Sequence, residues 1–155
     1  MKKRFAGGRG EGWVFAQLGL FALFLLTPTV GPTWPVELVF RIAGGTAALA
    51  GMAVLGASAI NLGRALTPFP RPLPSAHLVT GGAYRFVRHP IYFGVLLAAL
   101  GFALLSLSPL RLMLTLVMAL FFDRKADREE QWLSERYAGY EGYRRNVKKL
   151  IPWIY

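Results

Sequence analysis

Residues 88–123, RHPIYFGVLLAALGFALLSLSPLRLMLTLVMALFFD, decide the fold. Within residues 90–122 the only charged side chain is that of Arg111. A helix that crosses the ~30 Å hydrocarbon core of a bilayer needs about 20 apolar residues. The stretch therefore predicts two membrane helices in a short hairpin, with a tight turn at residues 106–109. Arg111 is expected to extend to the far headgroups, and a re-entrant hairpin is the alternative.

Two further uncharged runs precede this hairpin, at residues 12–36 and 42–63. The first begins with an apolar stretch, WVFAQLGLFALFLL, for which a cleaved signal peptide is the alternative. In the second, Ala43, Ala47 and Gly51 recur at every fourth residue, which permits close contact between helices. The runs predict an all-α integral membrane protein with about four transmembrane helices and a cytoplasmic amphipathic helix near the C-terminus. The expected spans are residues 13–30, 38–62, 90–107 and 109–123.

Composition and charge support this class. The 155 residues are a single domain's length; 54% are hydrophobic and 17% charged, with a net charge of +10 and no cysteine. So apolar a chain argues against a nucleic-acid-binding domain and favours a bilayer with anionic lipids. Of the 18 lysines and arginines, all but Arg41 and Arg111 fall on one side of the expected spans. A multi-pass protein with both termini cytoplasmic is therefore expected, in the inner or plasma membrane if bacterial.

The polar segment between the second and third spans begins with alternating prolines, TPFPRPLP at residues 67–74, which predict an extended strap. It continues as HLVTGGAYRFVRHPIYFG at residues 77–94. Arg85, Arg88 and His89 directly precede Pro90, which is well placed to start the third helix. The free N–H groups of such a helix start suit an anionic ligand group. Anchoring at the headgroups is the alternative for the arginines.

Two adjacent carboxylates, Glu129 and Glu130, follow the fourth span. Carboxylates at the rim of a membrane domain are costly unless they are paired, so they are candidate site residues. A solvated salt bridge between Lys125 and Glu129 is the alternative. A tyrosine stripe at every third residue is expected at the interface: Tyr137, Tyr140 and Tyr143. The two histidines and these glutamates lack the spacing of a metal site, and no metal is expected.

Together these motifs resemble the isoprenylcysteine carboxyl methyltransferase family and the related phospholipid methyltransferases. The similar segments are LVTGGAY, RHPIY, EEQWL and Tyr140-x-x-Tyr143 followed by IP, within residues 62–152. The resemblance implies a membrane enzyme that binds S-adenosylmethionine on the cytoplasmic side, through residues 64–92 and 123–152. It also implies a lipophilic methyl acceptor that enters from the bilayer.

Carried over by motif, the implied cofactor-binding residues are His77, Leu78, Val79, Tyr84, Arg88, His89, Pro90, Tyr92 and Glu129. A carboxylate or thiolate acceptor needs only a guiding cation, for which Arg124 and Lys125 are the candidates. An amine acceptor must lose a proton, for which Glu130 or a tyrosine is a candidate base.

The acceptor stays open among an isoprenylcysteine-type carboxylate, a lipid amine and a small thiol. A non-catalytic lipid-binding protein that retains the scaffold is the alternative function. If the two halves of the motif form one site, His89 and Glu129 must lie close together.

Overall fold

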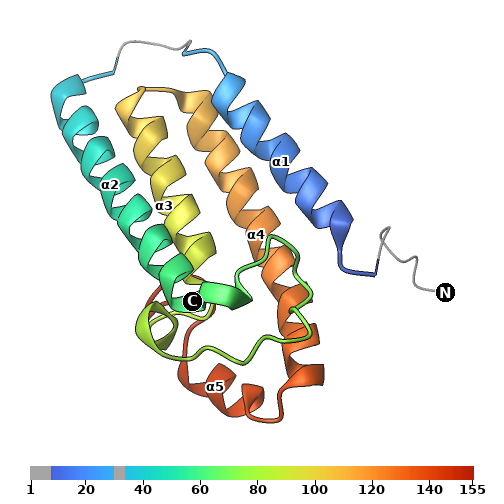
Figure 1. Cartoon of the computed structure of the whole chain (residues 1–155). Coiled ribbons are helices and arrows are strands. Elements are labelled where there is room, and N and C mark those ends of the chain that lie inside the picture. The colour runs from blue at the N-terminus through green and yellow to red at the C-terminus, as the bar shows by residue number, and fades with distance from the viewer. Residues whose placement is uncertain (1–7, 30–33) are drawn as a thin grey trace.

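The computed structural model describes residues 8–29 and 34–155. In Figure 1 the four long helices stand side by side in the order α2, α3, α4 and α1, and α5 lies at one end. Two short 3-10 helices, η1 and η2, lie in the segment between α2 and α3. The bounds are α1 Glu11–Leu26, α2 Glu37–Leu62, η1 Gly63–Ala65, η2 Gly82–Arg85, α3 Pro90–Leu105, α4 Pro109–Arg136 and α5 Tyr140–Asn146.

The all-helical prediction is confirmed for the described residues, whose only β-type pairing is an isolated bridge of Val87 with Lys148. The predicted hairpin turn is also confirmed, because α3 ends at Leu105 and α4 begins at Pro109. Ser108 caps α4 by accepting a hydrogen bond from the backbone N–H of Arg111. Part of the predicted charge bias rests on residues 2–4, and these lie outside the described residues. The end of the first predicted span, at residue 30, also lies outside them.

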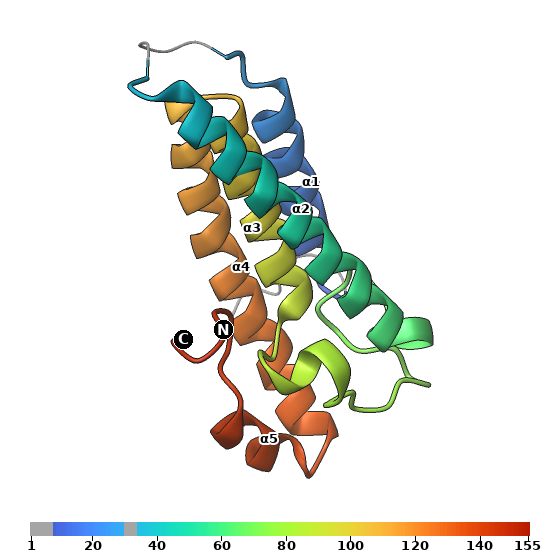
Figure 2. The same ribbon diagram turned by 90° about the vertical axis from the view of Figure 1, so that its left-hand side faces the viewer.

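The helix α4 continues past the expected membrane boundary at residue 123 without a break. It is 28 residues long, and its second half is the amphipathic segment that the sequence predicts. This half extends beyond the other long helices, as Figure 2 shows, where α2 is inclined across α3 and α5 lies beside the far end of α4. The extension carries both candidate carboxylates to one end of the bundle.

The four long helices differ in whether each is long and apolar enough to cross a membrane. Among the described helices, the one that is long and apolar enough to cross a membrane by itself is Glu37–Ala65, which is α2 continued into η1. The apolar helices α1 and α3 have 16 residues each, which corresponds to about 24 Å. The structure therefore supports one clear membrane helix, and the count of four crossings does not follow from helix length.

The expectation that Arg111 extends to the far headgroups is wrong. Its side chain is buried, and the guanidinium donates to the backbone oxygens of Phe24 and Thr27 and to the hydroxyl of Thr29. The last carbonyls of a helix lack partners within that helix. Since α1 ends at Leu26, Arg111 satisfies this end with charge-assisted hydrogen bonds and thereby attaches α1 to α4.

The contact between α2 and α3 depends on four glycines. A Cβ atom added to Gly94 would lie 2.8 Å from the backbone nitrogen of Leu55, and one added to Gly44, Gly51 or Gly101 would also clash with the facing backbone. The predicted small-residue row is therefore shifted. Gly51 takes part as expected, but Gly44 replaces Ala43, because the helix is rotated so that Ala43 is exposed.

We expect Gly101→Ala to destabilise the protein by roughly 1–3 kcal/mol, because the new methyl group forces the α2 and α3 backbones apart. The matched control is Gly56→Ala, on the same helix pair, where a Cβ meets nothing within 4 Å. It should be neutral or stabilising, since alanine is the better helix former. Thermal unfolding in detergent measures both, and equal midpoints for the two variants would contradict the close packing.

Candidate functional site

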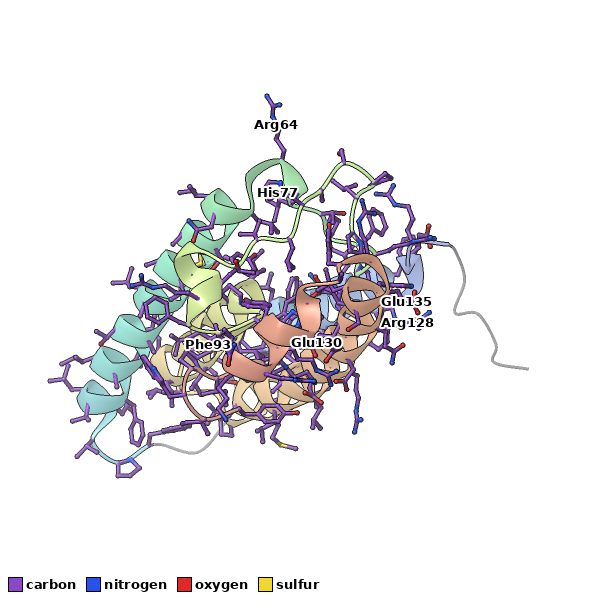
Figure 3. The ribbon with its side chains drawn as sticks, turned by 90° about the horizontal axis from the view of Figure 1, so that it is seen from below. Arg64, His77, Phe93, Arg128, Glu130 and Glu135 are labelled. Atoms are coloured by element: carbon purple, nitrogen blue, oxygen red, sulfur yellow. The ribbon has the colours of Figure 1, made fainter. Side chains whose placement is uncertain are left out.

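A cavity of about 380 Å³ lies at the end of the bundle where α3 begins and α4 extends. Its walls come from the strap, which in the structure extends beyond the predicted prolines to residues 65–79, and from the start of α3, the second half of α4 and the tyrosines around α5. Figure 3 views this end, with His77 on the side of the strap and Glu130 on the side of α4. The volume is in the range of small-molecule binding sites.

Two side chains of α4 and that of Tyr137, the residue after this helix, fasten the strap along the cavity. Lys125 Nζ donates to the carbonyl of Pro68 at 3.1 Å, Arg136 donates to the carbonyl of Pro74, and Tyr137 Oη donates to the carbonyl of Ala76 at 2.7 Å. An extended proline-rich segment makes few hydrogen bonds of its own, so its carbonyls are free to accept these donors. The strap is thereby held as a wall of the cavity.

The C-terminal segment is fastened beside the start of α3. The backbone N–H of Arg88 donates to the carbonyl of Lys148 at 2.8 Å, and that of His89 donates to the carbonyl of Lys149 at 3.1 Å. The Arg88 guanidinium also donates to the carbonyls of Arg144 and Val147. These bonds fix the two residues that directly precede the helix, and so fix where their side chains lie.

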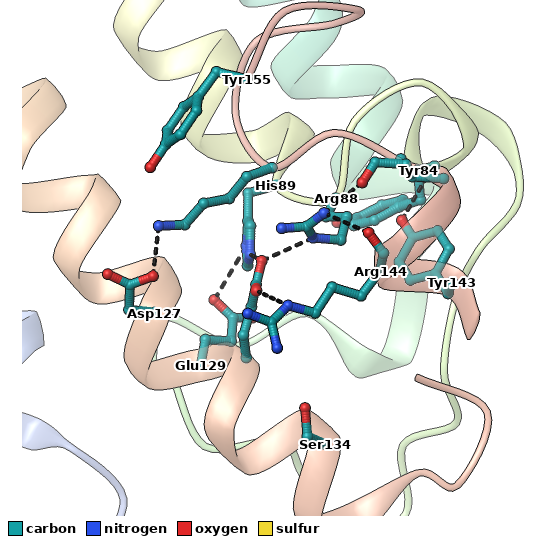
Figure 4. A network of polar contacts seen from close by, with 12 residues as sticks. Tyr84, Arg88, His89, Asp127, Glu129, Ser134, Tyr143, Arg144 and Tyr155 are labelled. Atoms are coloured by element: carbon teal, nitrogen blue, oxygen red, sulfur yellow. Dashed lines mark hydrogen bonds and ion pairs between the residues drawn. The ribbon is translucent and has the colours of Figure 1, made fainter. Parts of the chain in front are cut away.

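The two halves of the sequence motif meet, as expected (Figure 4). His89 Nδ1 lies 3.6 Å from Glu129 Oε2, and His89 Nε2 lies 3.1 Å from Glu130 Oε1. Arg88 Nε donates to Glu130 Oε1 at 2.8 Å. Tyr92, in the first turn of α3, donates from its hydroxyl to Glu129 Oε2 at 2.8 Å. Residues about 40 positions apart in sequence therefore form one polar network.

The two carboxylates of this network differ in environment. The Glu130 side chain is 5% exposed and faces Arg88, His89 and, more distantly, Arg144. Burial alone would raise its pKa, but the hydrogen bonds from His89 and Arg88 outweigh this and lower the pKa of Glu130 to about 2. The Glu129 side chain is 27% exposed and lines the cavity. Within the described chain, no donor contacts its second oxygen, Oε1.

Lys125 provides a buried cation on another wall of the cavity. It is 1% exposed, donates to Gln17 and Pro68, and lies 5.4 Å from the centre of the Tyr92 ring. Burial lowers the pKa of Lys125 to about 8, against a smaller opposing effect of Glu129. The alternative interpretation as a solvated salt bridge between Lys125 and Glu129 is wrong, because the lysine is turned into the protein.

Most residues expected at the site line this cavity, and three do not. Pro90 is buried at the first turn of α3, where it starts the helix. Arg124 is exposed on α4, because its neighbour in sequence occupies the inner face. Glu130 lies behind the wall, against Arg88 and His89. The expected residues that line it are His77, Leu78, Val79, Tyr84, Arg88, His89, Tyr92, Lys125 and Glu129.

Three tyrosines and a glutamine line the cavity but are absent from the site residues predicted from the sequence. The interpretation of Tyr137, Tyr140 and Tyr143 as an interfacial stripe is wrong, since all three line the cavity. Tyr140 is fully buried, and its hydroxyl has no hydrogen-bond partner in the described structure. Burial, reinforced by the Glu130 charge, raises the pKa of this hydroxyl, so it stays a neutral donor. Gln17 had one available signal, as the single polar side chain of residues 13–26.

Comparison with known proteins assigns this arrangement to a family. A family model described as phospholipid methyltransferase matches residues 39–139, which include the strap, the RHPIY motif and both carboxylates. The chain belongs to the phospholipid methyltransferase family. It is therefore a methyltransferase of the group that also includes the isoprenylcysteine enzymes, and the resemblance seen in the sequence is confirmed.

Individual proteins that are similar to this chain support the same family. Two proteins from rice, Oryza sativa subsp. indica and subsp. japonica, each named probable protein-S-isoprenylcysteine O-methyltransferase, are 31% identical over 144 residues. These alignments cover 90% of this chain and 73% of each relative. A protein-S-isoprenylcysteine O-methyltransferase from Schizosaccharomyces pombe is 40% identical over 79 residues, which is 50% of this chain and 34% of the relative.

The Glu130 ion pairs predict a specific dependence of stability on pH. Because the folded pKa, about 2, is below the ordinary value of 4.5, the charged pair stabilises the fold above about pH 4.5. This contribution is lost as the pH falls from 4.5 towards 2. Glu130→Gln should therefore destabilise the protein at pH 7 by roughly 3–5 kcal/mol.

The gap in unfolding free energy between Glu130→Gln and the original protein should narrow as the pH falls through this window. Denaturant unfolding at several pH values measures it. The exposed Glu135 on the same helix offers the control variant Glu135→Gln, which should leave stability nearly unchanged throughout. A gap that stays constant between pH 2 and 5 would contradict the assigned ion pair.

Proposed function

We propose that this protein transfers a methyl group from S-adenosylmethionine to a lipophilic acceptor at the cytoplasmic face of a membrane, with the cavity as its active site. The family supports methyl transfer. The observation that carries the assignment of the site is the convergence of the RHPIY motif and Glu129 on one cavity. Apolar side chains, an acidic group and a buried cation line this cavity together.

The residues of the cavity fit the chemistry of S-adenosylmethionine. The bound donor supplies an activated methyl group on a sulfonium, and it also carries an ammonium, a carboxylate and ribose hydroxyls. Glu129 offers a half-buried carboxylate oxygen, which suits the ammonium or a ribose hydroxyl. The unpartnered hydroxyl of Tyr140 offers a hydrogen-bond donor. The rings of Tyr84, Tyr92 and Tyr143 suit a cation.

In this proposal Arg88, His89 and Glu130 are positioning residues. The Nε and Nη1 atoms of Arg88 are engaged by Glu130 and by backbone carbonyls. The ion pair holds α4 and the C-terminal segment against the start of α3. His89 is stacked on Tyr92, with ring centres 5.3 Å apart, and contacts both glutamates. The three residues thus hold Glu129 and Tyr92 at the cavity wall.

The acceptor that the geometry favours carries a carboxylate. Removing a proton from an amine needs a base whose pKa lies near the working pH, but Glu130 lies outside the cavity and its pKa is about 2. Burial raises the pKa of the hydroxyls of Tyr84, Tyr140 and Tyr143, so these tyrosines stay protonated and are poor bases. An anion needs only a cation to guide it. Lys125 lines the cavity, whereas Arg124 does not. Methyl transfer then depends on alignment and on exclusion of water, which the strap and the tyrosines provide.

The membrane arrangement is part of the proposal. Large apolar side chains are exposed on the outer faces of α1, α2 and α4, and we propose that they contact lipid. The single domain of residues 1–155 would then cross the bilayer four times, with both termini cytoplasmic. The basic residues at the cavity end would face anionic headgroups. The most exposed of the apolar side chains include Phe15, Leu26, Leu49, Ile60, Leu116 and Leu120.

Glu129→Gln tests the cofactor site. Loss of a charge-assisted hydrogen bond is worth about 1.5–3 kcal/mol, so the affinity for S-adenosylhomocysteine should fall on the order of 10- to 100-fold. Calorimetry of the detergent-solubilised protein measures it. Glu135→Gln serves as the matched control, because Glu135 is exposed, lies six residues further along α4 and is outside the cavity. Equal affinities for the two variants would remove Glu129 from the site.

Tyr140→Phe should separate ligand binding from stability. Removing a buried hydroxyl that has no partner should leave unfolding unchanged or make the protein more stable. The same change should weaken binding of S-adenosylhomocysteine by about 3- to 10-fold, the effect of one neutral hydrogen bond. Unfolding and titration of this one variant measure both. Destabilisation together with unchanged affinity would show that the hydroxyl serves the fold and not the ligand.

A further inference from the structure

Gln17 is the single polar side chain of residues 13–26, the apolar stretch of α1, and it faces the cavity. Its position is fixed by aromatic contacts on either side. Trp13 lies with its ring centre 5.5 Å from that of Phe121, and Phe21 lies 6.2 Å from Phe122. Residues four apart share one face of a helix. Gln17 lies between them on this face and is therefore directed at α4, where Lys125 Nζ donates to its Oε1.

The charge of Lys125 forms no close ion pair in the described structure. Its Nζ donates to Gln17 Oε1 and to the carbonyl of Pro68, which are both neutral oxygens. No described carboxylate lies within 4.0 Å of it. A buried charge is costly unless it is paired. The arrangement therefore leaves one N–H of the ammonium available to the cavity, whose one acidic lining residue, Glu129, acts on Lys125 only at longer range.

Gln17 completes a set of donors. Because its Oε1 accepts from Lys125, its amide NH₂ group is the part that can serve a ligand, and no described side chain or carbonyl accepts from it. An ammonium N–H and an amide N–H side by side match the two oxygens of a carboxylate or another oxyanion. They offer nothing to a cationic head group.

We propose that Gln17 and Lys125 form the recognition site for an anionic head group of the methyl acceptor, and that Gln17 determines which acceptor is used. The inference rests on the proposed function and adds to it a residue of α1, outside residues 39–139 that the family model matches. The amide is essential because it orients Lys125 without neutralising it. A carboxylate at this position would pair with the lysine and remove the preference for an anion.

The test compares Gln17→Glu and Gln17→Met in the full chain, with Leu18→Met on the exposed face of the same helix as control. Laurate and dodecylamine have equal tails and opposite head charges. Binding of each to the detergent-solubilised protein is measured by calorimetry, with and without S-adenosylhomocysteine. The affinity for S-adenosylhomocysteine itself is measured separately, because it reports on the cofactor part of the cavity.

The original protein and Leu18→Met should both prefer laurate. Gln17→Met should weaken laurate binding by about 3- to 10-fold, as expected for one hydrogen bond. Gln17→Glu should weaken it by about 10-fold or more and improve dodecylamine binding, because the head site becomes neutral. All variants should bind S-adenosylhomocysteine as the original protein does.

An unchanged preference for laurate in Gln17→Glu, with S-adenosylhomocysteine still bound, would overturn the role of Gln17 and leave the proposed function standing. A parallel loss of both ligands in the Gln17 variants would also overturn it, since the residue would then hold the cavity as a whole. Failure of the original protein to bind S-adenosylhomocysteine would instead overturn the proposed function.

Discussion

The ion pair between Arg88 and Glu130 is the interaction on which the site depends. It joins the residue before α3 to the extension of α4, and the same guanidinium holds the carbonyls of the C-terminal segment. A buried ion pair adds stability only when its remaining hydrogen-bonding groups are satisfied. Here His89 and Arg144 occupy the other positions around the carboxylate. Three chain segments are thereby fixed around one carboxyl group.

This arrangement assigns different tasks to two adjacent residues of one sequence motif. Glu130 is buried and is held charged by its partners, whereas Glu129 lies one position earlier on the helix and faces the cavity. Successive residues of a helix differ by about 100° in direction, so a pair of glutamates can serve a structural and a ligand-binding role at once. Lys125, one turn earlier than Glu129, places a positive charge on the same side of α4. The cavity therefore has an acidic and a basic part.

Sequence reasoning found the helices because runs without charge mark apolar segments regardless of how they pack. It also identified the RHPIY motif and the pair of adjacent glutamates, because each of them is a short continuous stretch of sequence. The sequence alone does not predict the rotation of each helix about its axis. This rotation determines that Lys125, and not Arg124, lies on the inner face of α4. The buried position of Arg111 is not predicted, because a lone charged side chain in an apolar segment can be stabilised in two ways. It can reach water at the membrane surface, or it can be buried against a set of hydrogen-bond acceptors. The partners of Arg111 lie more than 80 residues away in sequence, and nothing local indicates them.

A structure of the protein bound to S-adenosylhomocysteine in a lipid nanodisc would decide whether this cavity is the cofactor site. The ligand should lie inside the cavity, enclosed by the strap and the tyrosines and in contact with Glu129. A ligand bound instead in the surface depression lined by Glu135, Glu141 and Arg144, or an empty cavity at saturating ligand, would contradict it.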